Sequence, residues 1–283
     1  MSRALVLAGG GLAGIAWELG VLLGIEDVDP GLAARLLDPA VDFVGTSAGS
    51  VVASQISGTL SLRHVHESHL TVSPPEVGAV FDAVEFGRIL EKTVEGATSP
   101  VDALQRVGRF ARDAETVEAA DRRAILVDRL PIHSWPKRRL LITAVDTDSG
   151  ELRVIDRHSG VELVDAVGAS CAVPGIWPTV EIDGRHYMDG GARSTANADL
   201  AAGADTVLIL VPSVEPSGSD PAAVSQAELD ALGDARVLIV YADAASVAAF
   251  GANPLDAAVG PAAARAGVAQ GQRIAAEVAD FWP

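Results

Sequence analysis

Short apolar runs and longer amphipathic stretches alternate along the N-terminal part of the chain. The run Ala4–Ala8 predicts a buried strand, and the apolar positions over Leu12–Val28 predict a helix directly after it. A second apolar run, Val41–Val44, is followed by another stretch that favours a helix, Ser50–Ser57. Because a strand–helix–strand order requires crossover connections, this pattern predicts a parallel sheet with helices on both faces.

The pattern changes between Ser61 and Pro136. Strand signals are absent there, Pro74 and Pro75 interrupt the chain, and helical periodicity predicts three helices, at residues 85–95, 101–114 and 117–128. We interpret residues 61–136 as a helical insertion that lies over or beside the sheet. The stretch Val101–Phe110 has an apolar face and an arginine face. It therefore suggests an acyl-chain site or a transient contact with a membrane surface, or else a helix that simply packs on the domain.

Strand signals return after the insertion. Apolar runs predict strands at residues 139–145, 151–155, 206–211 and 236–240, with a short helix at 162–169 and a long one at 261–278. Asp183-Gly184 between two short runs is typical of a two-residue hairpin turn, and Ser, Pro and Gly at 212–221 predict a loop. The chain thus predicts one α/β domain over residues 1–283, with three α/β/α layers and a mostly parallel central sheet.

Composition narrows the class of protein. The chain is 49% hydrophobic, yet no stretch approaches the roughly 18 apolar residues of a membrane-spanning helix, so we interpret the surplus as core. With 21 basic and 38 acidic residues the net charge is −17, which argues against a nucleic-acid partner and against strong attraction to anionic lipid. The N-terminal run is a poor signal peptide and the single cysteine fits a reducing compartment, so we expect a cytoplasmic location, at most peripheral to a membrane. The oligomeric state does not follow from the sequence.

A serine between two glycines is the first candidate for chemistry. Ser47 lies between Gly45 and Gly49, at the turn from a predicted strand into a predicted helix. Such a turn forces its central residue into strained geometry and exposes the side chain at the edge of the sheet. We therefore take Ser47 as a candidate nucleophile, the alternative being a structural turn that tolerates a serine.

A glycine cluster after the first strand supplies candidate amide donors. Gly9, Gly10 and Gly11 open the first helix, where backbone N–H groups have no helical partner, and consecutive turns of a parallel sheet share one edge. We expect these amides, Gly10 and Gly11 above all, to stabilise an oxyanion beside the serine. The spacing of Gly9, Gly11 and Gly14 also fits a dinucleotide-binding turn. That type of site needs an Asp or Glu at the end of the second strand to bind the ribose hydroxyls, whereas here the second strand is followed by Ser47.

The serine also needs a base. None of the six histidines follows His186, so the late histidine of an ordinary hydrolase triad is missing. Asp189 ends a predicted strand and precedes Gly190, which permits close backbone approach, and a shielded carboxylate can itself accept a proton. A plain Asp-Gly turn is the alternative. Cys171 has small apolar neighbours that favour packing over reactivity, and no His/Cys spacing indicates a metal site.

Taken in this order, the segments resemble the patatin-like lipid acyl hydrolases, also called patatin-like phospholipases. The block Ala169–Pro174 resembles the family as well, and the resemblance covers residues 4–58 and 140–211. It implies that Ser47 is the nucleophile and Asp189 its base, that the glycine cluster forms the oxyanion hole, that no cofactor is needed, and that the substrate is a fatty-acyl ester such as a phospholipid, lysophospholipid or glyceride. One departure is Ala13, where the family usually has Arg or Lys. Loss of this cation implies weaker binding of an anionic head group or a shifted substrate preference, without loss of the chemistry. A non-catalytic lipid-binding module of the same fold and an acyltransferase remain open.

Overall fold

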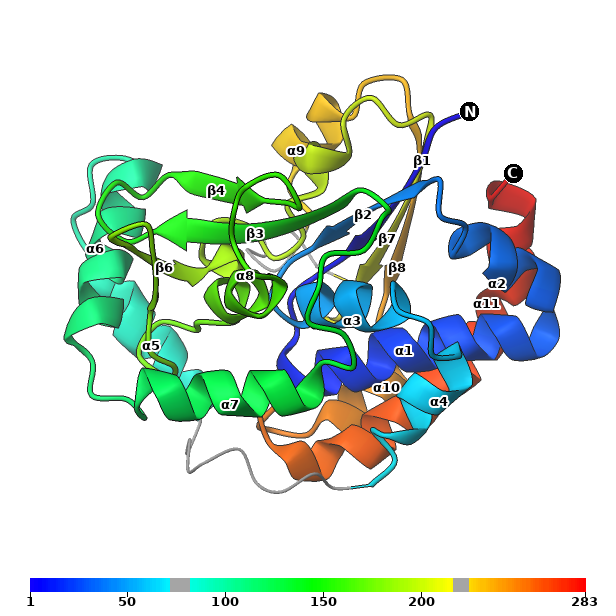
Figure 1. Cartoon of the computed structure of the whole chain (residues 1–283), viewed down its shortest axis with the longest axis horizontal. Helices are drawn as coiled ribbons and strands as arrows, with labels where there is room; N and C mark the ends of the chain where they lie inside the picture. The colour runs from blue at the N-terminus through cyan, green and yellow to red at the C-terminus, as the bar shows by residue number, and fades with distance from the viewer. Residues whose placement is uncertain (72–81, 216–223) are drawn as a thin grey trace.

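The computed structural model describes residues 1–71, 82–215 and 224–283; the proline pair and residues 216–221 of the predicted loop lie outside them. In this part of the chain eight strands form one sheet (Figure 1). They are β1 (Arg3–Leu7), β2 (Val41–Gly45), β3 (Leu140–Asp146), β4 (Leu152–Ile155), β5 (Val180–Ile182), β6 (Arg185–Asp189), β7 (Thr206–Val211) and β8 (Arg236–Tyr241).

Helices surround this sheet. They are α1 (Gly11–Val28), α2 (Pro30–Leu36), α3 (Ala48–Ile56), α4 (Leu62–Glu67), α5 (Ala83–Val94), α6 (Pro100–Asp113), α7 (Ala119–Arg129), α8 (Leu163–Ser170), α9 (Gln226–Ala231), α10 (Ala244–Phe250) and α11 (Gly260–Phe281). The described residues also form three short 3-10 helices, η1 (Gly190–Ala192), η2 (Ala198–Ala201) and η3 (Ala257–Val259). Among the helices that the structure describes, none combines the length and the apolarity needed to cross a membrane.

The sheet is mixed, with a parallel centre. Its order is β5-β6-β3-β2-β1-β7-β8, and β4 pairs with β3 off this path. Strands β3, β2, β1, β7 and β8 run parallel to one another. Strands β4 and β6 pair antiparallel with β3, and β5 pairs antiparallel with β6. The antiparallel part consists of the hairpins β3–β4 and β5–β6, the second of which Asp183-Gly184 predicted, and of the pairing between β3 and β6. The predicted α/β class with a mostly parallel sheet is confirmed.

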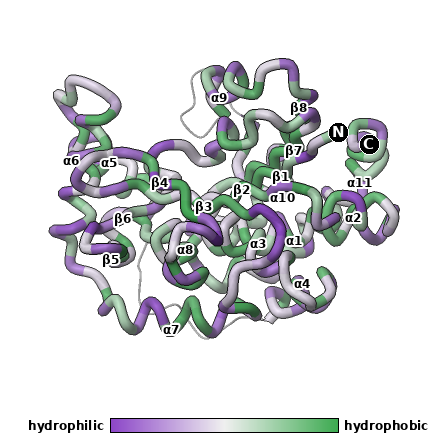
Figure 2. The backbone as a smooth tube through the Cα atoms, turned by 45° about the horizontal axis from the view of Figure 1, so that its top comes forward, coloured by the Kyte–Doolittle hydropathy of each residue, from purple (hydrophilic) through white to green (hydrophobic). Residues whose placement is uncertain are grey.

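Side chains alternate between the two faces of the sheet. On β3, Leu140 and Ile142 belong to the core shared with α1, α3, α8 and α11. Leu141 and Val145 face the other side, where η2 and α9 cover the centre and α5 and α6 cover the end of the sheet near β6. Figure 2 shows β1 and β7 as hydrophobic, as expected for strands covered on both faces.

The predicted insertion contributes to both faces of the sheet. Helix α6 packs Val107 and Ala111 against Val145 and Met188, so its apolar side is used within the domain. Helix α7 instead contributes Leu126 to the opposite core, beside α8. Its residues alternate between hydrophobic and hydrophilic in Figure 2. The three predicted helices are confirmed within a few residues, but α4, α9 and α10 were missed because six or seven residues carry little periodic signal.

Candidate active site

The chain reverses from β2 into α3 at Ser47, in a backbone conformation that few side chains adopt. Ser47 has φ 51° and ψ −115° and caps the start of α3. The flanking glycines are required by contact, because a Cβ at Gly45 would lie 2.7 Å from Ser50 Cα and one at Gly49 would lie 1.9 Å from the carbonyl oxygen of Leu7. Only a small and strained turn fits here, as the sequence predicted for a nucleophile.

The peptide groups around Ser47 are held by the end of α8. The N–H of Ser47 donates to Ser170 Oγ at 2.8 Å, and its carbonyl oxygen accepts from Ser50 Oγ at 2.7 Å and from Cys171 Sγ at 3.3 Å. Burial raises the pKa of the Cys171 thiol to about 11, so it stays protonated at neutral pH and acts as a donor. These contacts favour a packing role for Cys171 and give Ser170 a positioning role that the sequence reasoning missed.

Strand β3 brings Asp189 to the end of β2. Along β3, Gly45 of β2 pairs with Ile142, and Asp189 of β6 pairs with Ala144. Thr143 lies between these two pairs. Its Oγ1 is 2.9 Å from Thr46 Oγ1, and a Cβ on Gly190 would lie only 2.2 Å from it. The residues next to Ser47 and Asp189 therefore meet at one position of one strand, which also explains why position 190 must be glycine.

The side chain of Ser47 adjoins the buried carboxyl of Asp189. Burial raises the pKa of Asp189 to about 7, because the carboxylate is poorly solvated. Hydrogen bonds from the Ser47 side chain and from the N–H of Gly191, the latter at 2.7 Å, act in the opposite direction. The N–H of Asp189 donates to Ala172 O at 2.9 Å, which fixes the strand end against the loop after α8. A carboxyl that titrates near neutral pH thus adjoins the serine hydroxyl.

The glycine cluster lies on the other side of the serine. A Cβ on Gly9 would be 3.4 Å from Ser47 Cβ, so the loop and the serine are in contact. The N–H of Gly9 donates to Thr195 O at 2.8 Å and is therefore occupied. Within residues 1–71, 82–215 and 224–283, no group accepts from the N–H of Gly10 or Gly11. The oxyanion role expected for Gly9 is thus corrected to one of close approach, while Gly10 and Gly11 retain available donors.

The segment that contains Pro254 and Leu255 packs on the glycine loop near Ala13. Ala13 is fully buried and its N–H donates to Pro254 O at 3.0 Å. Gly11 has φ 63°, and a Cβ there would lie 2.8 Å from both Leu255 Cδ2 and Pro254 O. The segment before η3 therefore packs on this part of the glycine loop, and the side chain at position 13 has no access to solvent.

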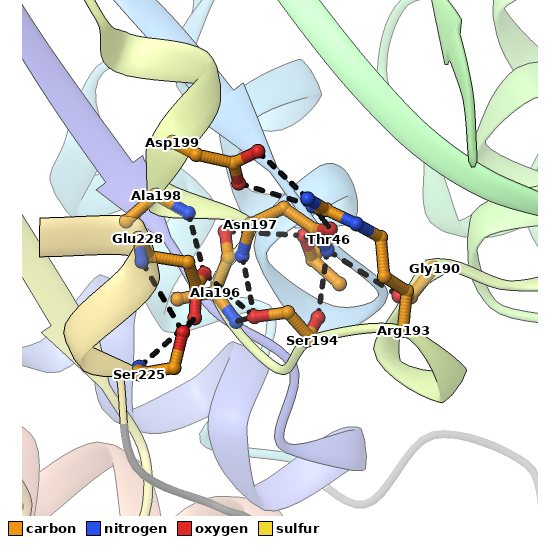
Figure 3. A network of polar contacts seen from close by, with 10 residues as sticks. All are labelled: Thr46, Gly190, Arg193, Ser194, Ala196, Asn197, Ala198, Asp199, Ser225 and Glu228. Carbon is orange, nitrogen blue, oxygen red and sulfur yellow. Dashed lines mark hydrogen bonds and ion pairs between the residues drawn. The ribbon is translucent and has the colours of Figure 1, made fainter. Parts of the chain in front are cut away.

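A buried polar network fixes the turn after Asp189 to the turn that carries Ser47 (Figure 3). At its centre, Asn197 has φ 50° and donates from Nδ2 to Thr46 Oγ1 at 3.1 Å, to Gly190 O at 3.3 Å and to Ser194 O at 2.6 Å. Its Oδ1 accepts from the Arg193 guanidinium at 2.7 Å. All polar atoms of this side chain are used, so the network holds one geometry.

Helix α9 holds the far end of this network. Glu228 accepts at Oε1 from Ser194 Oγ at 2.7 Å and from the Ala198 N–H at 2.9 Å. At Oε2 it accepts from the Ser225 N–H and hydroxyl, at 2.9 and 2.8 Å. The strand end that carries Asp189 is thus supported from the sheet face opposite α1. Neither Asn197 nor Glu228 has a sequence signal that distinguishes it from an ordinary loop or surface residue.

A small pocket of about 20 Å³, open to solvent, leads to Ser47. It is lined by Gly11, Leu12, Ile15, Ser47, Ala48, Arg122, Arg129, Cys171, Val173, Trp177 and Leu255. The histidines lie elsewhere. His186 Nδ1 hydrogen-bonds Thr179 Oγ1 at 3.1 Å and His133 Nε2 lies 2.9 Å from Val127 O. In the part of the chain that the structure describes, no group of three His, Cys, Asp or Glu side chains is placed to hold a metal ion.

This arrangement has the parts that acyl transfer needs. A hydroxyl stands at a strained turn, and a carboxyl that can accept its proton adjoins it. The glycine loop has two available backbone donors, and one of its glycines, Gly11, lines the same pocket as Ser47.

Comparison with known proteins connects the chain with one family. A sequence model of patatin-like phospholipases matches residues 5–202. Among solved structures, VipD from Legionella pneumophila is similar at 13% identity and a TM-score of 0.49, over 98% of this chain and 67% of that one. The type III effector protein ExoU is similar at 16% identity and a TM-score of 0.43, over 97% of this chain and 53% of that one. No match was found among curated proteins.

Proposed function

Because the chain belongs to the patatin-like phospholipase family, we propose that it is a serine esterase that cleaves fatty-acyl esters with Ser47 as nucleophile and Asp189 as general base. The observation that carries the proposal is that β3 brings the Ser47 turn beside a buried carboxyl, Asp189, whose pKa burial raises to about 7. A general base works best when its pKa lies near the working pH, because it is then both available and basic enough.

The reaction follows from these positions. Ser47 Oγ attacks the ester carbonyl carbon while Asp189 takes the hydroxyl proton, and the carbonyl oxygen becomes an oxyanion. The N–H groups of Gly10 and Gly11 donate to that oxyanion, and each such donor is worth about 2.7–4 kcal/mol in the transition state. When the carbon–oxygen bond breaks, the alcohol leaves with the proton from Asp189. Water, activated by the same carboxylate, then releases the acid from Ser47.

The lining of the pocket supports an acyl ester as substrate. The pocket has apolar walls beside Ser47, and these are formed by Leu12, Ile15, Val173 and Leu255. The expected membrane contact of α6 has less support, because the apolar side of that helix packs on β3 and β6. Contact with a membrane surface therefore stays a prediction.

Labelling with a fluorophosphonate probe tests the proposal. We expect the protein to react and to hydrolyse 4-nitrophenyl acyl esters, and Ser47→Ala to lose both activities while retaining its fold. Ser57→Ala is the matched control, because Ser57 ends the same helix and its hydroxyl bonds only Ala53 O. Probe labelling of Ser47→Ala at the wild-type rate would exclude the mechanism. Absence of labelling in the wild type would favour a non-catalytic lipid-binding module.

A further inference from the structure

One wall of the pocket at Ser47 comes from a segment that is far from the glycine loop in the chain. Leu255 lies between α10 and η3 and lines the pocket together with Gly11 and Ser47. This segment lies beyond residues 5–202, the range that matches the family model. The family match therefore does not account for this wall.

The segment around Leu255 is held against the glycine loop. The carbonyl oxygen of Pro254 accepts from the Ala13 N–H at 3.0 Å, so it binds one of the first-turn donors of α1. The N–H of Leu255 donates to Asn253 Oδ1 at 2.9 Å, which closes a turn within the segment. Gly11 permits the close contact, because a Cβ there would lie 2.8 Å from Leu255 Cδ2. These contacts fix the position of the wall.

The other apolar walls are supported as well. Trp177 is 2% exposed, and the guanidinium carbon of Arg122 lies 3.9 Å from the centre of its ring. The N–H of Trp177 donates to Val173 O at 3.0 Å, and both residues line the pocket. Ile15, on α1, is 2% exposed. Because closely packed side chains of this kind resist displacement, a ligand that is too large for the pocket is not accommodated without cost.

The space between these walls is small. A volume of about 20 Å³ holds about one or two groups of the size of a water molecule, and a methylene group is of similar size. All side chains that line the pocket are buried or half-buried. A long hydrocarbon chain therefore does not fit beside Ser47 while Leu255 stays in place.

The acyl half of the ester is the half that must fit. In the proposed reaction the acyl group stays bonded to Ser47 Oγ until water releases it. The alcohol instead departs, and the pocket has an open side toward solvent through which it can leave. The size of the pocket therefore limits the acyl group more than the alcohol.

We propose that Leu255 limits the length of the acyl chain, so that the preferred substrates are esters of short-chain acids of about two to four carbons. The inference rests on the proposed function, since it places the acyl group on Ser47. It makes Leu255 a specificity-determining residue, supplied by the segment between α10 and η3.

Two isomeric esters test the inference on the unchanged protein. Octyl butyrate and butyl octanoate have the same atomic composition and differ in which half of the ester carries the longer chain. Titration of the released acid, at concentrations at which neither ester aggregates, gives kcat/KM for each. We expect kcat/KM to be about 10-fold or more higher for octyl butyrate, because one methylene too many in a fixed apolar pocket already has an effect of that size. Equal values, or a preference for butyl octanoate, refute the limit on the acyl chain.

Variants identify the wall that sets the limit. We expect Leu255→Ala to raise kcat/KM for butyl octanoate relative to octyl butyrate by about 10-fold or more, because it removes side-chain volume from the pocket wall. Val173→Ala enlarges the pocket from another element and should shift the ratio in the same direction. Val259→Ala is the matched control and should leave the ratio unchanged, because Val259 lies in the adjacent η3 and packs against the core. An unchanged ratio in both Leu255→Ala and Val173→Ala contradicts the role of these walls.

Labelling with a fluorophosphonate that carries only short alkyl groups separates this inference from the function on which it rests. It also verifies that each variant has a folded site. If the wild type is labelled at Ser47 and cleaves both isomers equally well, the acyl limit is refuted and the esterase function stands. If the wild type is not labelled and cleaves neither ester, the esterase function itself is refuted.

Discussion

Ionisation of the buried Asp189 should lower the free energy of unfolding as pH rises. The variant Asp189→Asn cannot ionise and should not show this decrease. The asparagine has the same shape. Its Oδ1 can accept from the Gly191 N–H and its Nδ2 can donate to Ser47 Oγ, so both contacts of the carboxylate are replaced. The variant differs chiefly in that it cannot ionise. It should therefore lack esterase activity and still be the more stable protein at alkaline pH.

The size of the effect follows from the pKa. The folded value of about 7 lies about 3 units above the usual 3.8. A raised pKa means that folding favours the protonated form, so its contribution to stability is complete below pH 3.8 and is lost as pH rises to about 7. At 1.36 kcal/mol per unit the full loss is about 4 kcal/mol, of which about 2.5 kcal/mol falls between pH 5 and pH 8.

Urea unfolding of both proteins, followed by tryptophan fluorescence, measures this difference. The quantity to compare is the free energy of unfolding of Asp189→Asn minus that of the wild type, at pH 5 and at pH 8. It should rise by about 2.5 kcal/mol between them and stay constant above pH 8. Other groups, including the buried Glu18, titrate in both proteins and cancel. If this difference in the free energy of unfolding does not change with pH, the pKa of Asp189 is not raised. The argument that Asp189 acts as a general base near neutral pH then fails as well.

Four further outcomes follow from the same geometry. The kcat/KM for a neutral ester should increase with pH and level off above about 7, as Asp189 ionises; a flat profile from pH 5 to 9 contradicts this. Gly49→Ala should lower the free energy of unfolding by several kcal/mol through its clash with β1, whereas Gly87→Ala, in open space on α5, should raise it by about 0.5–1 kcal/mol. Asn197→Asp should cost about 2–3 kcal/mol in urea unfolding, because two carbonyl oxygens lose their donor. The free energy of unfolding of Ser47→Gly should be about 1 kcal/mol or more higher than that of Ser47→Ala, because glycine adopts the φ of 51° without strain.

Hydrophobic periodicity predicted most of the fold. The buried strands and the long helices were recognisable because their apolar runs match a period of 2 or 3.6 residues, and Asp183-Gly184 set the register of β5 and β6. The position of the insertion was not recognisable in the same way. Its helices have ordinary amphipathic patterns, and the pattern does not say which face of the sheet each helix covers.

The sequence predicted those features of the site that depend on local backbone geometry. Glycines around Ser47 and after Asp189 mark turns that need close approach, and a single sequence contains that signal. The roles assigned to these two residues stay predictions. The contributions of Asn197 and Arg122 were not visible, because both depend on contacts between segments far apart in the chain. A single sequence does not distinguish a buried Asn in a loop from an exposed one, or a buried Arg on a helix from an exposed one.

Strand β3 is the reason that the Ser47 turn and the Asp189 turn, which are far apart in the chain, lie side by side. Its first half pairs with β2 and its second half with β6, so two strands with opposite directions end next to each other at Thr143. One ends in the strained serine and the other in a buried carboxyl, each of which is unfavourable by itself. The central strands, covered on both faces, and the saturated hydrogen bonds of Asn197 hold this junction in place. A change in Asn197 should therefore reduce activity through the distance between hydroxyl and carboxyl, although Asn197 is not expected to touch the substrate.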